Sequence, residues 1–195
     1  MAQRLWGGEY QKTSSAIMGN KTFNRVMFVV LIAASSCGDK KDTVSAKIME
    51  IANSGTSGRA IFKNTKKGVK LTLTLVGKKN TRVAAHIHSG NECDYTDGST
   101  ALGHWNPTDE AHGYWGVEKH HSGDLGNIYL NSSGNGELVV LDKKKRWSLE
   151  KATKESFVGK TIIIHSGYDD GKAQPTGNAG ARIGCGKIGN GDIGK

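Results

Sequence analysis

Proline is almost absent from this sequence, and histidine is confined to its middle. Only 2 of the 195 residues are proline whereas 27 are glycine, a balance that suits a turn-rich β protein better than a bundle of helices. No histidine occurs before residue 86 or after residue 165, so all seven fall in one part of the chain. Clustered imidazoles beside a carboxylate are typical of copper and zinc sites. A metal centre is therefore favoured over unrelated surface and core histidines.

The sequence also lacks the features by which proteins bind nucleic acid. Its formal net charge is +9, which suits a nucleic acid, an anionic membrane surface or a small anionic substrate. It has no basic helix, no strand that interleaves aromatic and basic residues and no zinc-finger spacing, so we expect no nucleic-acid partner. The basic run at residues 143–146 (KKKR) is predicted to be a solvated loop, with a weak contact to an anionic surface as the alternative.

The apolar run from Val26 to Ala34 is too short to cross a bilayer as a helix, and its flanks are those of a secretory signal. Lys21 and Arg25 lie at its start, and small residues and then Cys37 follow it. This order resembles a bacterial lipoprotein signal, in which the cysteine is acylated and becomes the mature N-terminus. Residues 18–36 are thus expected to be the signal and 37–43 a polar tether, with a simple cleaved signal as the alternative.

This signal fixes the expected location of the protein. Residues 1–17 fit no part of the signal, so we expect Met18 to be the start and 1–17 to be an upstream extension or a tag. The protein is expected to be exported to the periplasm or cell envelope and held at a membrane by lipid on Cys37. In such oxidising surroundings Cys93 and Cys185 are predicted to form a disulfide. The alternative is that both thiolates bind copper.

Residues 44–195 contain no linker and no repeat of fixed period, so they are predicted to form one domain. Leu71, Leu73 and Leu75 alternate with threonines, which is the period of a half-buried strand. Strand-like segments occupy residues 45–51, 58–65, 68–77, 82–88, 126–131, 136–142 and 159–166. The turn sequence SSGNGE at 132–137 predicts a hairpin, and only residues 148–157 can make a short helix. Many short antiparallel strands with glycine-rich turns predict a sandwich or a barrel.

Two long segments, 91–125 and 167–187, do not follow the strand pattern, and loops of that length in a compact domain are usually functional. His86 and His88 are two apart on a strand, so their side chains leave the same face. His165 ends another apolar strand that can bring it to the same point. The first long segment then offers His104, His112, His121 and Asp124. A set of four imidazoles and a set mixing imidazole with carboxylate match the preferences of copper and zinc, respectively.

Five motifs follow one another along the chain: HIH, GHWNPTDEAHG, HSGDLGN, IIIHSGYDD and QPTGNAGARIGCGKI. In these motifs and their order the chain resembles the copper/zinc superoxide dismutases, from residue 46 to 189. The resemblance implies an all-β fold, an eight-stranded antiparallel Greek-key β-barrel of sandwich-like form with long metal-binding and electrostatic loops.

The resemblance assigns a role to each candidate residue. It implies that copper is bound by His86, His88, His104 and His165, and zinc by His104, His112, His121 and Asp124, so that His104 is an imidazolate shared by both. Asp169 hydrogen bonds to a ligand imidazole on each metal, and Arg182 guides the anion beside copper. Cys93 and Cys185 correspond to the family's intrasubunit disulfide.

The implied activity is the dismutation of superoxide to dioxygen and hydrogen peroxide, by alternating reduction and oxidation of copper with zinc in a structural role. Steering of the anion by the protein's field should make the rate fall with ionic strength. A homodimer is compatible with the family. The alternatives are a lipoprotein of the same fold that stores metal without turnover, and a surface adhesin that uses residues 143–146.

Three residues depart from the family pattern, and the charged residues that line the family's substrate funnel are not plainly reproduced. His120 precedes a zinc-ligand position and is expected to be exposed and not a ligand. Tyr114 and Trp115 add two aromatic side chains to the zinc-binding segment without an evident purpose. Lys172 is a candidate substitute for the charged residues that line the family's substrate funnel.

Overall fold

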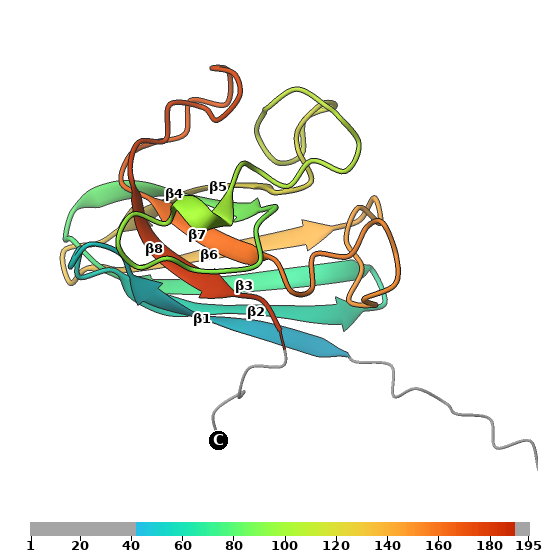
Figure 1. The fold of residues 1–195 in the computed structure, drawn as a ribbon, viewed down its shortest axis with the longest axis horizontal. Helices are drawn as coiled ribbons and strands as arrows, with labels where there is room; N and C mark the ends of the chain where they lie inside the picture. The colour runs from blue at the N-terminus through green and yellow to red at the C-terminus, as the bar shows by residue number, and fades with distance from the viewer. Residues whose placement is uncertain (1–41, 190–195) are drawn as a thin grey trace, which may run out of the picture. The chain divides into compact units, whose positions relative to one another are not determined.

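The computed structural model describes residues 42–189, which fold into an all-β domain (Figure 1). Its strands are β1 (Thr43–Glu50), β2 (Ser57–Thr65), β3 (Gly68–Val76), β4 (Thr81–His88), β5 (Asp124–Leu130), β6 (Asn135–Asp142), β7 (Thr161–His165) and β8 (Arg182–Lys187). A 3₁₀-helix covers Ser99–Ala101. No helix within 42–189 has the length and apolar character to span a bilayer. The expected upstream extension, signal and acylated Cys37 lie outside the described residues.

All neighbouring strands are antiparallel, in the order β5-β4-β7-β8-β1-β2-β3-β6. Strands far apart in sequence are neighbours in space, as β1 is with β8 and β3 with β6. This is the expected Greek-key connectivity. The two edge strands, β5 and β6, contact one another, so the sheet closes almost completely into the eight-stranded barrel that was predicted.

The core lies inside the barrel, where alternate residues of each strand point. Leu71, Leu73 and Leu75 of β3 are buried, and the threonines between them are not. Phe62 of β2 packs against Phe157 and Trp147, with ring centroids 4.6 and 5.7 Å apart, respectively. The predicted alternation of β3 is therefore confirmed.

A tight turn forms at SSGNGE, but the predicted hairpin does not, because the two strands that the turn joins are not paired in the sheet. The amide of Asn131 donates to the Asn135 carbonyl at 2.9 Å and so closes the turn. The turn joins β5 to β6, which stand at opposite ends of the strand order. It therefore brings the two edges of the sheet together, while β6 pairs along its length with β3.

Two further predictions about the elements were wrong. The segment 167–187 was interpreted wholly as a loop, but its last six residues form β8, between β7 and β1. Residues 148–157 form turns and an isolated bridge between Ser148 and Ser156 instead of a helix. Leu149 and Phe157 lie near the two ends of this irregular segment. Both are buried and belong to the hydrophobic core.

Candidate metal centre

Strands β4 and β7 present three imidazoles on the outer face of the barrel. Ile87 points into the core, so His86 and His88 point outward on either side of it. His165 of β7 lies opposite Ala84 of β4 in the ladder, and side chains of opposed residues share a face. The three imidazoles therefore leave the same face, as predicted from the spacing of the first two.

The long loop that precedes β5 lies beside the end of β4 and supplies the fourth imidazole. The amide of Trp105 donates to the Ile87 carbonyl, and the amide of Ile87 donates to the Gly123 carbonyl, both at 2.8 Å. A Cβ added at Gly123 would be 2.2 Å from the Ile87 carbonyl oxygen, so only glycine allows this approach. The attachment places His104 beside His88, with ring centroids 5.0 Å apart.

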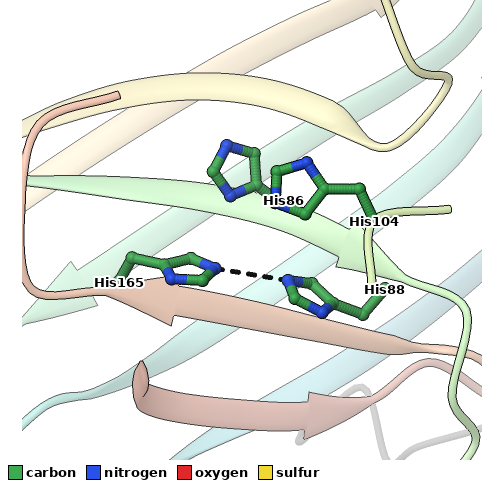
Figure 2. A group of neighbouring side chains, drawn as sticks. All are labelled: His86, His88, His104 and His165. Carbon is green, nitrogen blue, oxygen red and sulfur yellow. Dashed lines mark hydrogen bonds between the residues drawn. The ribbon is translucent and has the colours of Figure 1, made fainter. Parts of the chain in front are cut away.

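The four imidazoles converge, as Figure 2 shows. One ring nitrogen of each of His86, His88, His104 and His165 lies within 4.8 Å of the others. The Nε2 atoms of His88 and His165 are 3.2 Å apart, the contact dashed in the figure. The predicted copper-ligand set is therefore assembled in space, and all four rings are buried.

The protonation of His88 and His165 shows why this cluster suits a cation. Nδ1 of His88 donates to the Leu102 carbonyl at 2.8 Å, and Nδ1 of His165 donates to the Gly180 carbonyl at 3.1 Å. Burial lowers the pKa of His165 to about 3 and lowers that of His88 well below its ordinary value. Both rings are thus neutral near pH 7, and their two Nε2 lone pairs face each other. A cation bound to both nitrogens would remove this repulsion.

The second set is built around the carboxylate of Asp124, at the start of β5. Its Oδ1 lies 2.9 Å from His104 Nδ1 and 3.2 Å from His121 Nδ1, and its Oδ2 lies 3.0 Å from His112 Nδ1. Burial would raise the pKa of Asp124, but the three imidazoles hold it far below the usual range. The carboxylate is therefore ionised among three ring nitrogens, the donor set that zinc prefers.

Unpartnered nitrogens test whether the two sets fit metals. Nδ1 of His86, Nε2 of His104 and Nδ1 of His112 are buried without a hydrogen-bond partner; for His112 the nearby Asp124 oxygen is close enough but outside hydrogen-bond geometry. Buried polar atoms normally have partners. Because these three nitrogens belong to the two convergent sets, the residues present fit two metal ions that share His104.

Asp169 joins the two sets, as predicted. Its Oδ2 accepts from His86 Nε2 at 2.9 Å and its Oδ1 accepts from His112 Nε2 at 2.8 Å. Both bonds direct the remaining nitrogen of the ring toward its own set. Burial opposes ionisation of Asp169, but the bonds from His112 and His86 hold its pKa well below the usual range.

Three residues that hold this bridge were not identified from the sequence. Asn127 of β5 exchanges two hydrogen bonds with the backbone of Asp169, at 2.8 and 2.9 Å. The Gln174 side chain exchanges two with the backbone of His112, at 2.8 and 3.0 Å. Gly177 has φ +67°, and a Cβ there would be 2.0 Å from Asp169 Oδ1. A side-chain amide that bonds to backbone atoms, or a glycine that makes room for a neighbour, forms no recognisable residue pattern in a single sequence.

Arg182 lies beside the first set at the start of β8. Its Nη2 donates to the Leu102 carbonyl at 2.5 Å and its Nη1 donates to the Gly98 carbonyl. It lines an open depression of about 570 Å³ together with Thr96, Gly180 and Ala181. Lys172 is exposed and is not among the residues that line this depression, so its role in guiding substrate stays a prediction.

The predicted disulfide between Cys93 and Cys185 is present, which excludes both cysteines as copper ligands. Cys185 lies in β8, opposite Met49 of β1. Cys93 lies in the loop that contains Gly98. The disulfide therefore ties the loop that supplies a carbonyl to Arg182 to the strand that carries Arg182.

The prediction that His120 is exposed was wrong, because this side chain is only 2% exposed. Its ring packs on Trp115 at 4.9 Å, and Trp115 packs on Trp147 at 4.6 Å. His120 Nδ1 donates to the His121 carbonyl at 2.8 Å. The structure thus gives Trp115 a purpose: it covers His120 and extends the aromatic core into the loop that carries His112 and His121. His120 belongs to neither convergent set.

Arg146 and Tyr114 also fix this loop to its surroundings. Nη1 of Arg146 donates to Glu110 Oε2 at 2.7 Å and to the His120 carbonyl at 3.0 Å. Arg146 is therefore not part of a solvated basic run, unlike the three exposed lysines before it. The Tyr114 hydroxyl lies 3.1 Å from that of Tyr168, in the loop after β7. Both long loops are thus held together at a distance from the ligands themselves.

Sequence comparison agrees with this geometry. The sequence model of the copper/zinc superoxide dismutase family matches residues 56–188. Superoxide dismutase [Cu-Zn] 2 of Aquifex aeolicus is 40% identical over 135 residues, which cover 67% of this chain and 78% of that protein. The superoxide dismutase [Cu-Zn] of Podospora anserina is 36% identical over 156 residues, covering 75% and 97%, respectively.

Solved structures of similar fold include a double mutant of a SOD-like protein from Bacillus subtilis, with a TM-score of 0.63 and 28% identity over 73% of this chain and 94% of that one. The clock protein EA4 has a TM-score of 0.68 at 23% identity, covering 77% and 96%. At that identity the likeness concerns the fold alone.

Proposed function

The chain belongs to the copper/zinc superoxide dismutase family, and from this premise we propose which side chains bind each metal and which handle the substrate. The protein catalyses dismutation of superoxide: two superoxide anions and two protons give dioxygen and hydrogen peroxide. Copper and zinc are its cofactors. The observation that carries this conclusion is the pair of four-residue ligand sets with His104 common to both.

In the proposal, copper is held by His86, His88, His104 and His165, and zinc by His104, His112, His121 and Asp124. When bound, copper supplies the one-electron oxidation and reduction that the reaction needs, and zinc supplies charge without redox change. The unpartnered Nδ1 of His86 and Nε2 of His104 support the first set. The ionised Asp124 among three imidazole Nδ1 atoms supports the second.

Arg182 is proposed to bind the superoxide anion. A guanidinium has five N–H donors, and the two bonds to Gly98 and Leu102 leave three for a substrate. Those two bonds also fix the plane of the group, and its charge is permanent. Arg182 therefore offers directed donors to an anion in the depression beside the first ligand set.

His104 is proposed to hold and deliver a proton. Its Nδ1 faces Asp124 Oδ1 at 2.9 Å, whereas its Nε2 is buried and has no partner. Nε2 is thus the ring atom that can take up a proton whenever it is not bound to copper, and pass it to the peroxide product. Asp169 acts on the rings of His86 and His112 by orienting them, as a positioning residue.

Activity and metal content test this proposal together. Protein loaded with copper and zinc is assayed for superoxide removal by pulse radiolysis or by inhibition of cytochrome c reduction. Rapid removal that disappears in His88→Ala, with zinc retained, supports the assignment. Full occupancy by both metals without activity would instead favour metal storage.

We further propose that the protein is exported and attached to a membrane of the cell envelope by lipid on Cys37. The signal-like order of basic residues, apolar run, small residues and cysteine in residues 18–37 supports this. Residues 44–195 would then form the mature enzyme domain behind a short tether. Incorporation of labelled palmitate into the wild-type chain and not into Cys37→Ser would support acylation, and equal labelling would contradict it.

A homodimer is proposed through the sheet near Val76 and Tyr129. Both side chains are at least half exposed, at 50% and 58%, and they line the same open depression. Exposed apolar surface of this kind is typical of contacts between copies. Sedimentation of wild type and Tyr129→Glu tests it: a dimer that the substitution dissociates is expected, and a wild-type monomer would contradict it.

A further inference from the structure

One end of the barrel carries seven exposed lysines that the catalytic function does not use. They come from the β2–β3 hairpin and from the loop after β6, and we call this surface the lysine end: Lys63, Lys66, Lys67, Lys70, Lys143, Lys144 and Lys145. None of the seven forms an ion pair with another residue in the described range 42–189.

The strand register brings these lysines together. Lys63 of β2 lies directly opposite Lys70 of β3, and opposed side chains share a face about 5 Å apart. Lys66 and Lys67 form the turn between the two strands. A Cβ at Gly68 would be 3.6 Å from the Lys143 Cα, so this turn lies against the start of the second group.

Acidic groups nearby offset only part of the charge of this surface, where one exposed acidic residue, Asp42, lies beside Asn64 among the seven lysines. The carboxylate of Asp142 is buried and accepts from the backbone amides of Lys144 and Trp147, at 3.1 and 2.8 Å. Glu110 is paired with Arg146. Like charges directly opposed across a strand pair are destabilising, so the Lys63–Lys70 pair favours an anionic partner that offsets the repulsion.

The chain enters the domain at the lysine end. Thr43, the first residue of β1, lies opposite Lys63, and the amide of Asn64 donates to the Asp42 carbonyl at 2.8 Å. Thr43 is the sixth residue after Cys37, a span of at most about 22 Å when extended. Lipid on Cys37 would therefore hold this end close to a membrane surface.

Arg182 lies toward the other end of β1. That strand runs from Thr43 to Glu50, where Glu50 pairs with Gly184, two residues from Arg182. At the usual rise per residue of a strand, Thr43 and Glu50 at the two ends of β1 are roughly 20 Å apart. In Figure 1 the β2–β3 turn and the start of β1 lie together at the right-hand side of the barrel.

We propose that the lysine end binds the anionic headgroups of the membrane and so directs the depression beside Arg182 away from the lipid. The orientation rests on the proposed acylation of Cys37, whereas the affinity of the lysine end for anionic lipid does not. Basic residues near such a surface each strengthen binding about fivefold, and salt weakens the effect.

The test uses the full chain with Cys37→Ser, so that acylation plays no part. Binding is measured by co-sedimentation with vesicles of phosphatidylcholine alone and of an equal mixture with phosphatidylglycerol. We expect preference for the mixture, and Lys66→Gln with Lys67→Gln to weaken binding to it by more than tenfold. The matched control replaces Lys78 and Lys79, two exposed lysines in the turn at the other end of β3, and should change binding less than twofold.

Three results would overturn the proposal. The first is no preference for the anionic vesicles, and the second is an equal loss of vesicle binding in the two double variants. The third is that Lys66→Gln with Lys67→Gln loses binding to heparin but keeps its binding to the anionic vesicles. The last would favour a soluble or cell-surface polyanion as the partner. Failure of palmitate labelling at Cys37 would remove the orientation but leave the measured lipid preference standing. The two proposals therefore fail separately.

Discussion

His88 and Arg182 share one hydrogen-bond acceptor, the carbonyl oxygen of Leu102. It lies 2.8 Å from Nδ1 of His88 and 2.5 Å from Nη2 of Arg182. The shared atom fixes a proposed copper ligand and the guanidinium proposed to bind superoxide relative to one another. Leu102 has φ +62° and ψ −149°, a region that is rare for residues other than glycine. The backbone is thus held in an unfavourable conformation where it positions both groups.

Replacement of Arg182 by lysine should separate charge from geometry. Lysine keeps the charge but cannot bond to Gly98 and Leu102 while presenting directed donors. We expect Arg182→Lys to keep both metals and lower kcat/KM about tenfold, and Arg182→Ala to lower it further and flatten its dependence on ionic strength. Pulse radiolysis over a range of salt concentrations measures both effects. Wild-type kinetics in Arg182→Ala would contradict the role.

Asp169→Asn should weaken both metal sites at once. An amide cannot accept from His86 and His112 together, because only one of its two polar atoms is an acceptor. Loss of such an orienting bond typically costs 10- to 100-fold in metal affinity, and competition with a chelator measures this for each metal. The matched control is Asp170→Asn, since the hydrogen bonds of the Asp170 carboxylate within residues 42–189 go to Lys172, Ala173 and Asn178 of its own loop. Similar losses in the two variants would point to a general disturbance of the loop.

His120 and His121 should respond differently to removal. His121→Ala is expected to lose zinc, because Nδ1 of His121 is one of three imidazole nitrogens around Asp124. His120→Ala should keep zinc and lower the free energy of unfolding by about 1–3 kcal/mol, since a buried ring packed on Trp115 is lost. Metal analysis and denaturant unfolding distinguish them. Loss of zinc in His120→Ala with retention in His121→Ala would reverse the assignment.

The Glu110–Arg146 pair should slow the loss of zinc. Both side chains are more than two-thirds buried, and the pair joins the loop after β6 to the loop that carries His112. A double-mutant cycle with Glu110→Gln and Arg146→Gln should give a coupling free energy of about 1 kcal/mol. Each single variant should release zinc faster than the wild type does. The double variant should release zinc no faster than Arg146→Gln does. Wild-type release rates in all three would remove this role.

Patterns of alternating side chains made most strands predictable, and β8 shows where such patterns fail. Its sequence, RIGCGK, has glycine at alternate positions, so no apolar alternation is visible. The glycines are needed for packing: a Cβ at Gly186 would be 2.6 Å from the Lys47 carbonyl oxygen of β1. Its two partner strands are β7, which ends 17 residues before β8 begins, and β1, which lies more than 130 residues earlier in the sequence.

The proposed ligands were predictable because their side chains carry the chemistry, whereas their supports were not. His86 and His88 on one strand, and Asp124 after four loop histidines, mark themselves by residue type and spacing, but only the family resemblance selects His121 over His120. Burial of His120 depends on Trp115 and Trp147, which meet only after the loop folds onto the barrel. Asn127 and Gln174 act on backbone atoms, a role that leaves no pattern in one sequence.

The central claim is that two metal ions share the imidazole of His104, and metal binding by His104→Ala tests it most directly. The wild-type chain should bind one copper and one zinc, measured by elemental analysis and by the electron paramagnetic resonance spectrum of copper. In His104→Ala the dissociation constants of both metals should rise, and the copper spectrum should change. If only one metal is weakened and the other binds as in wild type, the two sites do not share this ring and the account is wrong.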